Sequence, residues 1–168
     1  MWLYNGSELK DDDIPETAIG FIYLITHTPT GKQYIGKKLL TKAATKTVKG
    51  KKKKIRKESD WKDYWSSSPD LKTFISEEGE DKFTREILAF AASKGSIAYL
   101  EEMALYQVGA LESLNWFNNN IRSKVYRTWI FKDVDAAKSL RELLNKRFCS
   151  SSPAPIVVCH PTNPQSKP

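Results

Sequence analysis

Three short segments with strand character constrain the fold of this chain most strongly. Residues 21–26 (Phe-Ile-Tyr-Leu-Ile-Thr) are β-branched and aromatic, and residues 27–32 have the composition of a turn. Residues 33–36 (Gln-Tyr-Ile-Gly) then return to strand character, which predicts a β-hairpin with a loop of about six residues. Residues 83–88 alternate apolar and polar side chains and are expected to form a third strand.

The register of the predicted hairpin decides which side chains share a face. If Thr26 pairs with Gln33, Tyr23 lies opposite Gly36 and is a diagonal neighbour of Tyr34, with Cα atoms roughly 7–8 Å apart. Gly36 would then leave a gap opposite Tyr23 where a phosphate could approach the backbone. Tyrosine is also common in ordinary strands, so the pair alone does not establish a site.

The rest of the sequence predicts one small α+β domain, a three-stranded antiparallel sheet flanked by helices. Ser68 as N-cap and Pro69 in the first turn predict a helix that ends near Glu78. Amphipathic patterns predict two further helices. The expected organisation is a lead-in at 1–19, a domain at 20–148 with a basic insertion at 41–59, helices at 96–111 and 135–147, and a disordered Pro- and Ser-rich tail at 149–168.

The charge balance favours a polyanionic partner. The chain of 168 residues has 27 Lys and Arg against 20 Asp and Glu, a net charge of +7. Seven of the nine residues 49–57 are cationic, so this part of the insertion is expected to be a flexible or ribbon-like excursion. A nucleic acid would use such a segment for phosphate contacts that carry no sequence information. The expected contacts are Lys51, Lys52, Lys53, Lys54 and Arg56; a nuclear-localisation role for the lysine run is an alternative.

Several classes of protein are disfavoured. The two cysteines, Cys149 and Cys159, lack the spacing of a zinc site and do not form a disulfide framework, which favours a reducing, cytoplasmic location. Three aspartates at 11–13 precede any apolar run, so a signal peptide is not expected. No apolar stretch is as long as a membrane span. The sequence leaves the oligomeric state open.

One carboxylate on the 96–111 helix points toward the core side. At about 100° per residue, Ile97, Leu100 and Ala104 form an apolar face, and Glu101 falls within its edge whereas Glu102 falls outside it. A partly buried carboxylate needs a partner. A divalent cation is one such partner, and a lysine on the flank of the helix is the other.

Phe21-Ile22-Tyr23, followed after ten residues by Tyr34-Ile35-Gly36, resembles the motif pair of the GIY-YIG endonucleases, with Phe21 in place of the leading glycine. The resemblance continues through the third strand, the 96–111 helix and Trp116-Phe117-Asn118, and covers roughly residues 20–120. Residues 59–67 are similar to phage-borne members of the family. The resemblance implies a DNA endonuclease that acts with Mg²⁺ or Mn²⁺, in the cytoplasm of the host cell if the chain is phage-encoded.

The resemblance also implies roles for individual residues. Glu101 is expected to hold the metal ion, which binds the scissile phosphate. Tyr23 and Tyr34 are expected to orient or deprotonate the attacking water. Asn118 is expected to support the site, although Asn115, Asn119 and Asn120 leave its register open.

One part of the family pattern is missing from this chain. The family commonly has an arginine about ten residues beyond the second tyrosine, where this chain has Ala44. The cation is expected to be Lys37, with Lys38 beside it or Arg56 as alternatives, because Lys37 follows the second motif directly. Neither histidine fits as a general base, since His27 lies in the predicted turn and His160 in the tail.

Two other functions remain compatible with the sequence. The same scaffold without catalysis would be a basic DNA- or RNA-binding protein, which the missing arginine and the lysine run favour. A basic structural protein of a ribonucleoprotein would explain the charge but not the paired tyrosines. Trp61, Tyr64 and Trp65 fit either base stacking or core packing.

Overall fold

A computed structural model describes residues 1–48, 51–121 and 134–149 of the chain, with the backbone alone described at 46–48, 51–54 and 149. The predicted tail therefore lies outside the described residues from residue 150 onward. No helix in the described part of the chain combines the length and apolar character that a membrane crossing requires.

The main sheet has five strands in the order β2-β1-β7-β3-β4. Its centre is the predicted antiparallel trio: β3 (Gly20–His27), β4 (Gln33–Leu39) and β7 (Phe83–Ala91). The expectation of a three-stranded antiparallel sheet is wrong in number and type, because β1 (Leu3–Tyr4) pairs with β7 in parallel and with β2 (Ser7–Glu8). These strands of two residues show no periodicity in the sequence, and burial of Trp2 holds them against the sheet.

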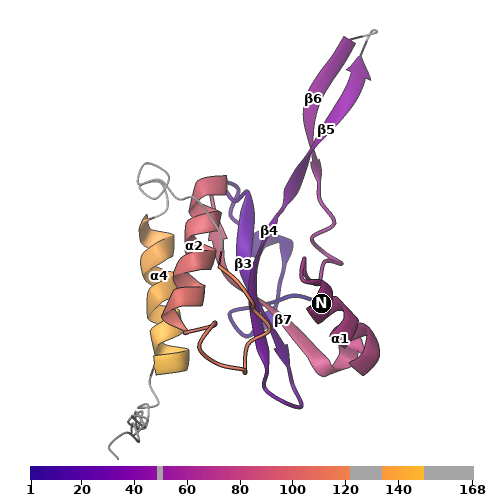
Figure 1. Ribbon diagram of the computed structural model, residues 1–168. Helices are drawn as coiled ribbons and strands as arrows, with labels where there is room; N and C mark the ends of the chain where they lie inside the picture. The colour runs from indigo at the N-terminus through magenta and orange to yellow at the C-terminus, as the bar shows by residue number, and fades with distance from the viewer. Residues whose placement is uncertain (49–50, 122–133, 150–168) are drawn as a thin grey trace, which may run out of the picture.

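Helices cover both faces of this sheet (Figure 1). α2 (Lys94–Gln107) and α4 (Val134–Leu144) pack on one face, in a core with Ile22, Leu24 and Ile35. α1 (Pro69–Glu78) and Trp61 cover the other face, in a second core with Phe21, Tyr23 and Ile25. Because β3 is central and covered on both sides, its run of apolar residues is nearly continuous rather than alternating.

The helices begin close to the predicted positions, but α2 ends four residues before its predicted end at residue 111. Ser68 caps α1 by accepting a hydrogen bond from the Leu71 amide, as expected. α2 begins two residues before the predicted start, because the Ser93 hydroxyl caps it, and ends at Gln107 ahead of Gly109, whose φ is +61°. α4 continues into a π-helical turn at Asn145–Cys149, and two short 3₁₀ turns occur at Asp11–Asp13 and Glu80–Lys82.

The basic insertion forms a separate two-stranded antiparallel hairpin of β5 (Thr41–Val48) and β6 (Lys51–Glu58). It projects from the body of the molecule (Figure 1), which confirms the ribbon-like form of the predicted excursion. Its base is fixed where it leaves the sheet. The Ser59 amide and hydroxyl donate hydrogen bonds of 2.9 and 2.6 Å to the Leu40 and Leu39 carbonyls, and the Leu40 amide donates to Ile19.

Candidate functional site

The two motif tyrosines lie on one face of the β3–β4 hairpin. The register pairs Tyr23 with Gly36 and Ile25 with Tyr34, as predicted. The tyrosine rings are neighbours, with centroids 6.1 Å apart. Tyr23 is fully buried, whereas Tyr34 retains 8% exposure. The hairpin therefore brings both phenols together but gives only Tyr34 access to the surface.

The predicted gap above Gly36 is filled, so the expectation that a phosphate approaches the backbone there is wrong. A Cβ on Gly36 would lie 2.5 Å from the Tyr23 hydroxyl and 2.8 Å from Cε1 of Tyr34. The space that glycine leaves is taken by the two tyrosine rings themselves. Gly36 is therefore required for packing of the tyrosines rather than for access to a ligand.

The hydroxyl of Tyr23 is isolated inside the protein. Burial raises its pKa well above the ordinary value, and the neighbouring phenols of Tyr34 and Tyr64 raise it further. Tyr64 and Ser66 are close enough to affect this pKa, but no described atom meets hydrogen-bond geometry with the Tyr23 hydroxyl. Tyr23 is consequently protonated at physiological pH and is poorly suited to remove a proton from water.

Glu101 lies where α2 passes the edge of β4. Its carboxylate Oε2 is 2.7 Å from Nζ of Lys37, and the Lys37 backbone amide also hydrogen-bonds the carboxylate. Burial raises the pKa of Glu101, and both Lys37 contacts oppose that rise. The lysine partner that the sequence left open is thus present, and it is the same lysine that was expected to neutralise phosphate charge.

Side chains from three segments meet along the outer edge of β4. In an edge strand, every second residue points its backbone N–H and C=O groups away from the neighbouring strand. In β4 three such residues have partners outside the sheet. The first, at Gln33, pairs with the backbone of Asn115 and Phe117. The second is at Ile35: Asn118 accepts a hydrogen bond of 3.0 Å from its amide and donates one of 2.8 Å to its carbonyl. The third is Lys37, whose backbone amide hydrogen-bonds Glu101. Asn118 and Glu101 therefore bind neighbouring outward-facing residues of β4.

Asn118 and Asn119 make different contacts. Asn118 is the residue that clamps β4, whereas Asn119 donates a hydrogen bond to Asp70 of α1. Tyr34 and Asn118 line one pocket of about 280 Å³, together with Ser67, Asp70 and Phe117. The polar groups of Ser67 and Asp70 were not predicted as site residues, because they are near Tyr34 only in the folded chain.

Lys37 and Lys38 point to opposite faces of the sheet. Lys37 reaches Glu101 on the α2 face. Lys38 lies on the tyrosine face, with its Nζ 3.0 Å from Oδ1 of Asp60 and 3.5 Å from the centroid of the Tyr64 ring. A single phosphate beside Glu101 would therefore meet Lys37 and not Lys38.

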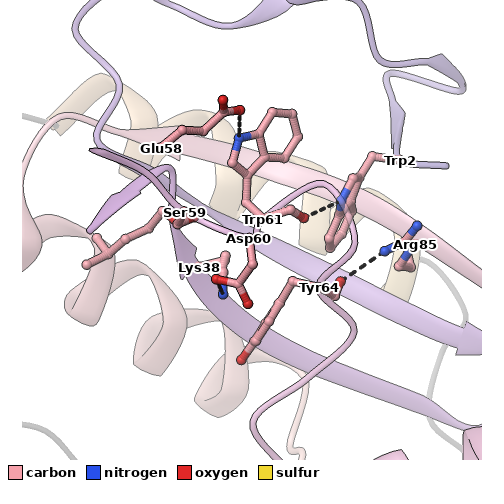
Figure 2. A network of polar contacts seen from close by, with 9 residues as sticks. Trp2, Lys38, Glu58, Ser59, Asp60, Trp61, Tyr64 and Arg85 are labelled. Atoms are coloured by element: carbon pink, nitrogen blue, oxygen red, sulfur yellow. Dashed lines mark hydrogen bonds and ion pairs between the residues drawn. The ribbon is translucent and has the colours of Figure 1, made fainter. Parts of the chain in front are cut away.

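A second cation missed by the sequence analysis holds the segment after the basic hairpin (Figure 2). Arg85 of β7 is buried and donates hydrogen bonds to the carbonyls of Tyr64 and Lys62, between the rings of Trp2 and Trp65. Burial lowers its pKa. Arg85 shares the buried face of β7 with Phe83 and Ile87, and its partners come from distant segments, so local sequence carried no signal of its contacts.

The aromatic residues that follow the hairpin belong to this packed region. Trp61 is buried, donates a hydrogen bond to Glu58, and accepts one at its carbonyl from the Trp2 indole (Figure 2). Tyr64 packs against Tyr23 with ring centroids 6.1 Å apart. Core packing is therefore the role that the structure gives to Trp61 and Tyr64, and base stacking is not needed to explain them.

The remaining predicted residues lie on the basic hairpin. Ala44, at the position of the missing arginine, is in β5, and Arg56 is an exposed residue of β6. Lys51, Lys52, Lys53 and Lys54 are in β6, where only their backbone is described. The hairpin projects away from the body of the molecule (Figure 1), and Lys37 is the cation that contacts the Glu101 carboxylate.

The donor set suits a hard divalent ion only in part. In the described residues, no three His, Cys, Asp or Glu side chains gather in one place, so a cage made by the protein alone is not present there. Mg²⁺ commonly uses one or two carboxylates and takes its other ligands from water and phosphate. Glu101, with 18% side-chain exposure, fits that single role, although Lys37 holds its carboxylate in an ion pair of 2.7 Å.

Comparison with known proteins gives one family. The chain matches the family model described as "Putative endonuclease segE, GIY-YIG domain" over residues 2–121, which includes both tyrosine motifs, α2 and Asn118. Searches of curated proteins and of solved structures give no match. A family match over more than half of the chain, on residues that the fold brings to one strand edge, places this protein in the GIY-YIG endonuclease family.

Proposed function

We propose that this protein is a metal-dependent endonuclease that hydrolyses phosphodiester bonds of DNA. One observation carries the proposal. A partly buried carboxylate, Glu101, and a lysine, Lys37, meet at the edge of β4, one outward position from Asn118. An anionic metal ligand, a phosphate-binding cation and a rigid strand edge are the parts that such hydrolysis needs.

In the proposed reaction Glu101 holds the metal and Lys37 turns to the scissile phosphate. The divalent ion, Mg²⁺ or Mn²⁺, supplies Lewis-acid stabilisation of the phosphate and of the departing oxygen. The ammonium of Lys37 offsets the charge that develops on the phosphate, as a point charge rather than as a bidentate fork. Asn118 keeps β4 in place through its two hydrogen bonds to Ile35.

Tyr34 has the more direct role of the two tyrosines in this proposal. Tyr34 lines the pocket that Asn118 also lines, whereas Glu101 and Lys37 meet on the opposite face of β4. In the proposal its phenol therefore orients the attacking water, or accepts its proton, across the outer edge of the strand. Tyr23 is buried, and its high pKa keeps it protonated, so it acts by packing Tyr34 over Gly36. Both tyrosines were expected to act on the attacking water; in this proposal only Tyr34 does so.

DNA is the proposed partner and the cytoplasm of a host cell the proposed location. The family is one of endonucleases, and the net charge of +7 favours a polyanion. The cations of the basic hairpin, Lys51–Lys54 and Arg56, are proposed to contact the DNA backbone. Such contacts make binding strongly dependent on salt.

The proposal is tested by cleavage of supercoiled plasmid with and without Mg²⁺ or Mn²⁺. Glu101→Ala is expected to abolish cutting while leaving DNA binding nearly intact. Glu102→Ala, one residue along the same helix, is the matched control and is expected to cut like the wild type. Cutting that survives Glu101→Ala would contradict the assignment.

A non-catalytic DNA- or RNA-binding protein is the second candidate. It is favoured by Ala44 in place of the arginine and by Lys37, which occupies the carboxylate that the metal would need. Tight binding of plasmid, branched and modified DNA without any cutting in either metal would establish it.

A further inference from the structure

A groove lies between the base of the basic hairpin and the first turn of α2. Its volume is about 460 Å³, within the range of roughly 300–1,000 Å³ typical of ligand sites. Its walls include the apolar side chains of Leu39 and Ile97 and the cations Lys37, Lys42 and Lys94. We call it the basal groove. Because Lys37 lines it and also contacts Glu101, the groove is continuous with the candidate site.

Two lysines of the basal groove have no described acidic partner. Lys37 is paired with Glu101, and Lys38 with Asp60. Asp60 also lines the groove; its pKa is lowered chiefly by the hydrogen bond from Lys38 and to a smaller extent by the charge of Lys42. Within the described residues, no carboxylate lies within ion-pair distance of Lys42 or Lys94. The lining holds four lysines and one aspartate, so the groove carries excess positive charge, and the positive end of the α2 dipole adds to it at Lys94.

The pairing of the hairpin adds independent support. Lys42 of β5 lies directly opposite Lys57 of β6, and both are exposed. Like charges at directly opposite positions destabilise a β-ribbon. An isolated two-stranded ribbon is itself only marginally stable, so this pair is costly for folding alone. A phosphate between the two ammonium groups would turn the repulsion into attraction.

We propose that the basal groove binds the DNA backbone next to the scissile phosphodiester. Lys42 and Lys94 of the groove, and Lys57 opposite Lys42 on the hairpin, contact phosphates. The inference rests on the proposed function, because it places the bound strand on the hairpin side of Glu101. Hydrogen bonds of Ser59 and Leu40 fix the hairpin base to the body, so the backbone that carries Lys42 and Lys57 is in place before DNA binds. DNA would thus extend from the site along the hairpin.

The first test is the salt dependence of binding to a short DNA duplex, measured by fluorescence anisotropy in EDTA. The slope of log K against log salt changes by about 0.9 for each phosphate contact. Lys42→Ala and Lys94→Ala are each expected to flatten it by about one, and the double variant by about two. Lys138→Ala in α4 removes the same charge from an exposed site and is expected to leave the slope unchanged. Equal slopes for all four variants and the wild type would overturn the proposal.

A second variant separates binding from stability. Lys57→Glu replaces the like-charge pair with an attractive one, so thermal unfolding is expected at an equal or higher temperature. DNA binding by the same variant is expected to weaken. If Lys57→Glu leaves binding unchanged, the hairpin base does not contact phosphate.

Kinetics distinguish failure of this proposal from failure of the nuclease assignment. Lys42→Ala and Lys94→Ala are expected to raise KM more than they lower kcat, whereas Glu101→Gln lowers kcat. A wild type that never cuts DNA, with slopes that still respond to Lys42 and Lys94, would refute the nuclease and keep the groove. A wild type that cuts, with groove variants that behave like Lys138→Ala, would refute the groove.

Discussion

The two β-hairpins of this protein have the same backbone pattern and opposite environments. In β3–β4 the sheet is covered by helices on both faces, and Phe21, Ile22 and Ile35 are completely buried. In β5–β6 none of the described side chains is buried. The first hairpin is held by packing, while the second is held by its backbone pairing and by its base at Leu40 and Ser59.

Under the proposed function, this difference would separate chemistry from binding within one small domain. A reacting group must be held rigidly, and β4 is rigid because both faces are packed and Asn118 and Glu101 fix its outer edge. A surface that follows DNA needs exposed cations instead, and a projecting ribbon keeps them in water until DNA arrives. The basal groove joins the two regions through Lys37 and Lys42.

The largest expected effect concerns the two tyrosines of the packed hairpin. Tyr34→Phe removes a hydroxyl that lines the pocket beside Asn118, and we expect DNA cleavage to slow by about 10²-fold or more. Tyr23→Phe removes a buried hydroxyl without a described partner, and we expect cleavage and stability to be retained. Single-turnover cleavage and thermal unfolding measure both. A larger rate loss in Tyr23→Phe would reverse the proposed division of roles.

Shortening the exposed hairpin is expected to have the next largest effect. Replacing residues 44–55 with Asn-Gly leaves Ala43 opposite Arg56 and removes six lysines. We expect DNA affinity at physiological salt to fall roughly tenfold or more, with a much flatter salt slope. The unfolding temperature should change little, because none of the described hairpin side chains is buried. A large loss of stability would show that the hairpin supports the body after all.

Adding side-chain volume is expected to lower stability in the packed hairpin and to have little effect in the exposed one. Gly36→Ala places a Cβ against Tyr23 and Tyr34, and we expect unfolding free energy to fall by about 1–3 kcal/mol. The matched change in the exposed ribbon, Ala43→Val, adds more volume and should cost less than about 0.5 kcal/mol. Chemical denaturation measures both values. Equal costs at the two positions would contradict the contrast in packing.

The smallest expected effect is a pH dependence of stability. Burial raises the pKa of Glu101, so the folded protein binds that proton more readily than the unfolded chain. Ionisation of Glu101 therefore lowers stability as pH rises through and above its ordinary pKa of 4.5. Glu101→Gln should unfold at an equal or slightly higher temperature than the wild type at pH 7, with the difference vanishing toward pH 4. A variant less stable at pH 7 would show that the Lys37 contact outweighs burial.

Local patterns were enough to predict much of the fold. The register of Tyr23 with Gly36, the Ser68 cap of α1 and the ribbon form of the insertion follow from alternation, capping and charge, which act between near neighbours in sequence. Strands of two residues such as β1 carry no such pattern. Their addition to the sheet required Trp2 to find its place against β3 and the Trp61 segment.

The sequence was enough to name most residues of the candidate site, but not to predict which of them contact one another. The sequence by itself determined that Tyr23 and Tyr34 share a face and that Glu101 turns toward the core, because strand and helix periodicities fix side-chain direction. Only the tertiary structure decided that Lys37 rather than Lys38 meets Glu101, that Asn118 closes the edge of β4, and that the tyrosines fill the space at Gly36. Those contacts join segments far apart in the chain, and their geometry is set by how the helices pack on the sheet.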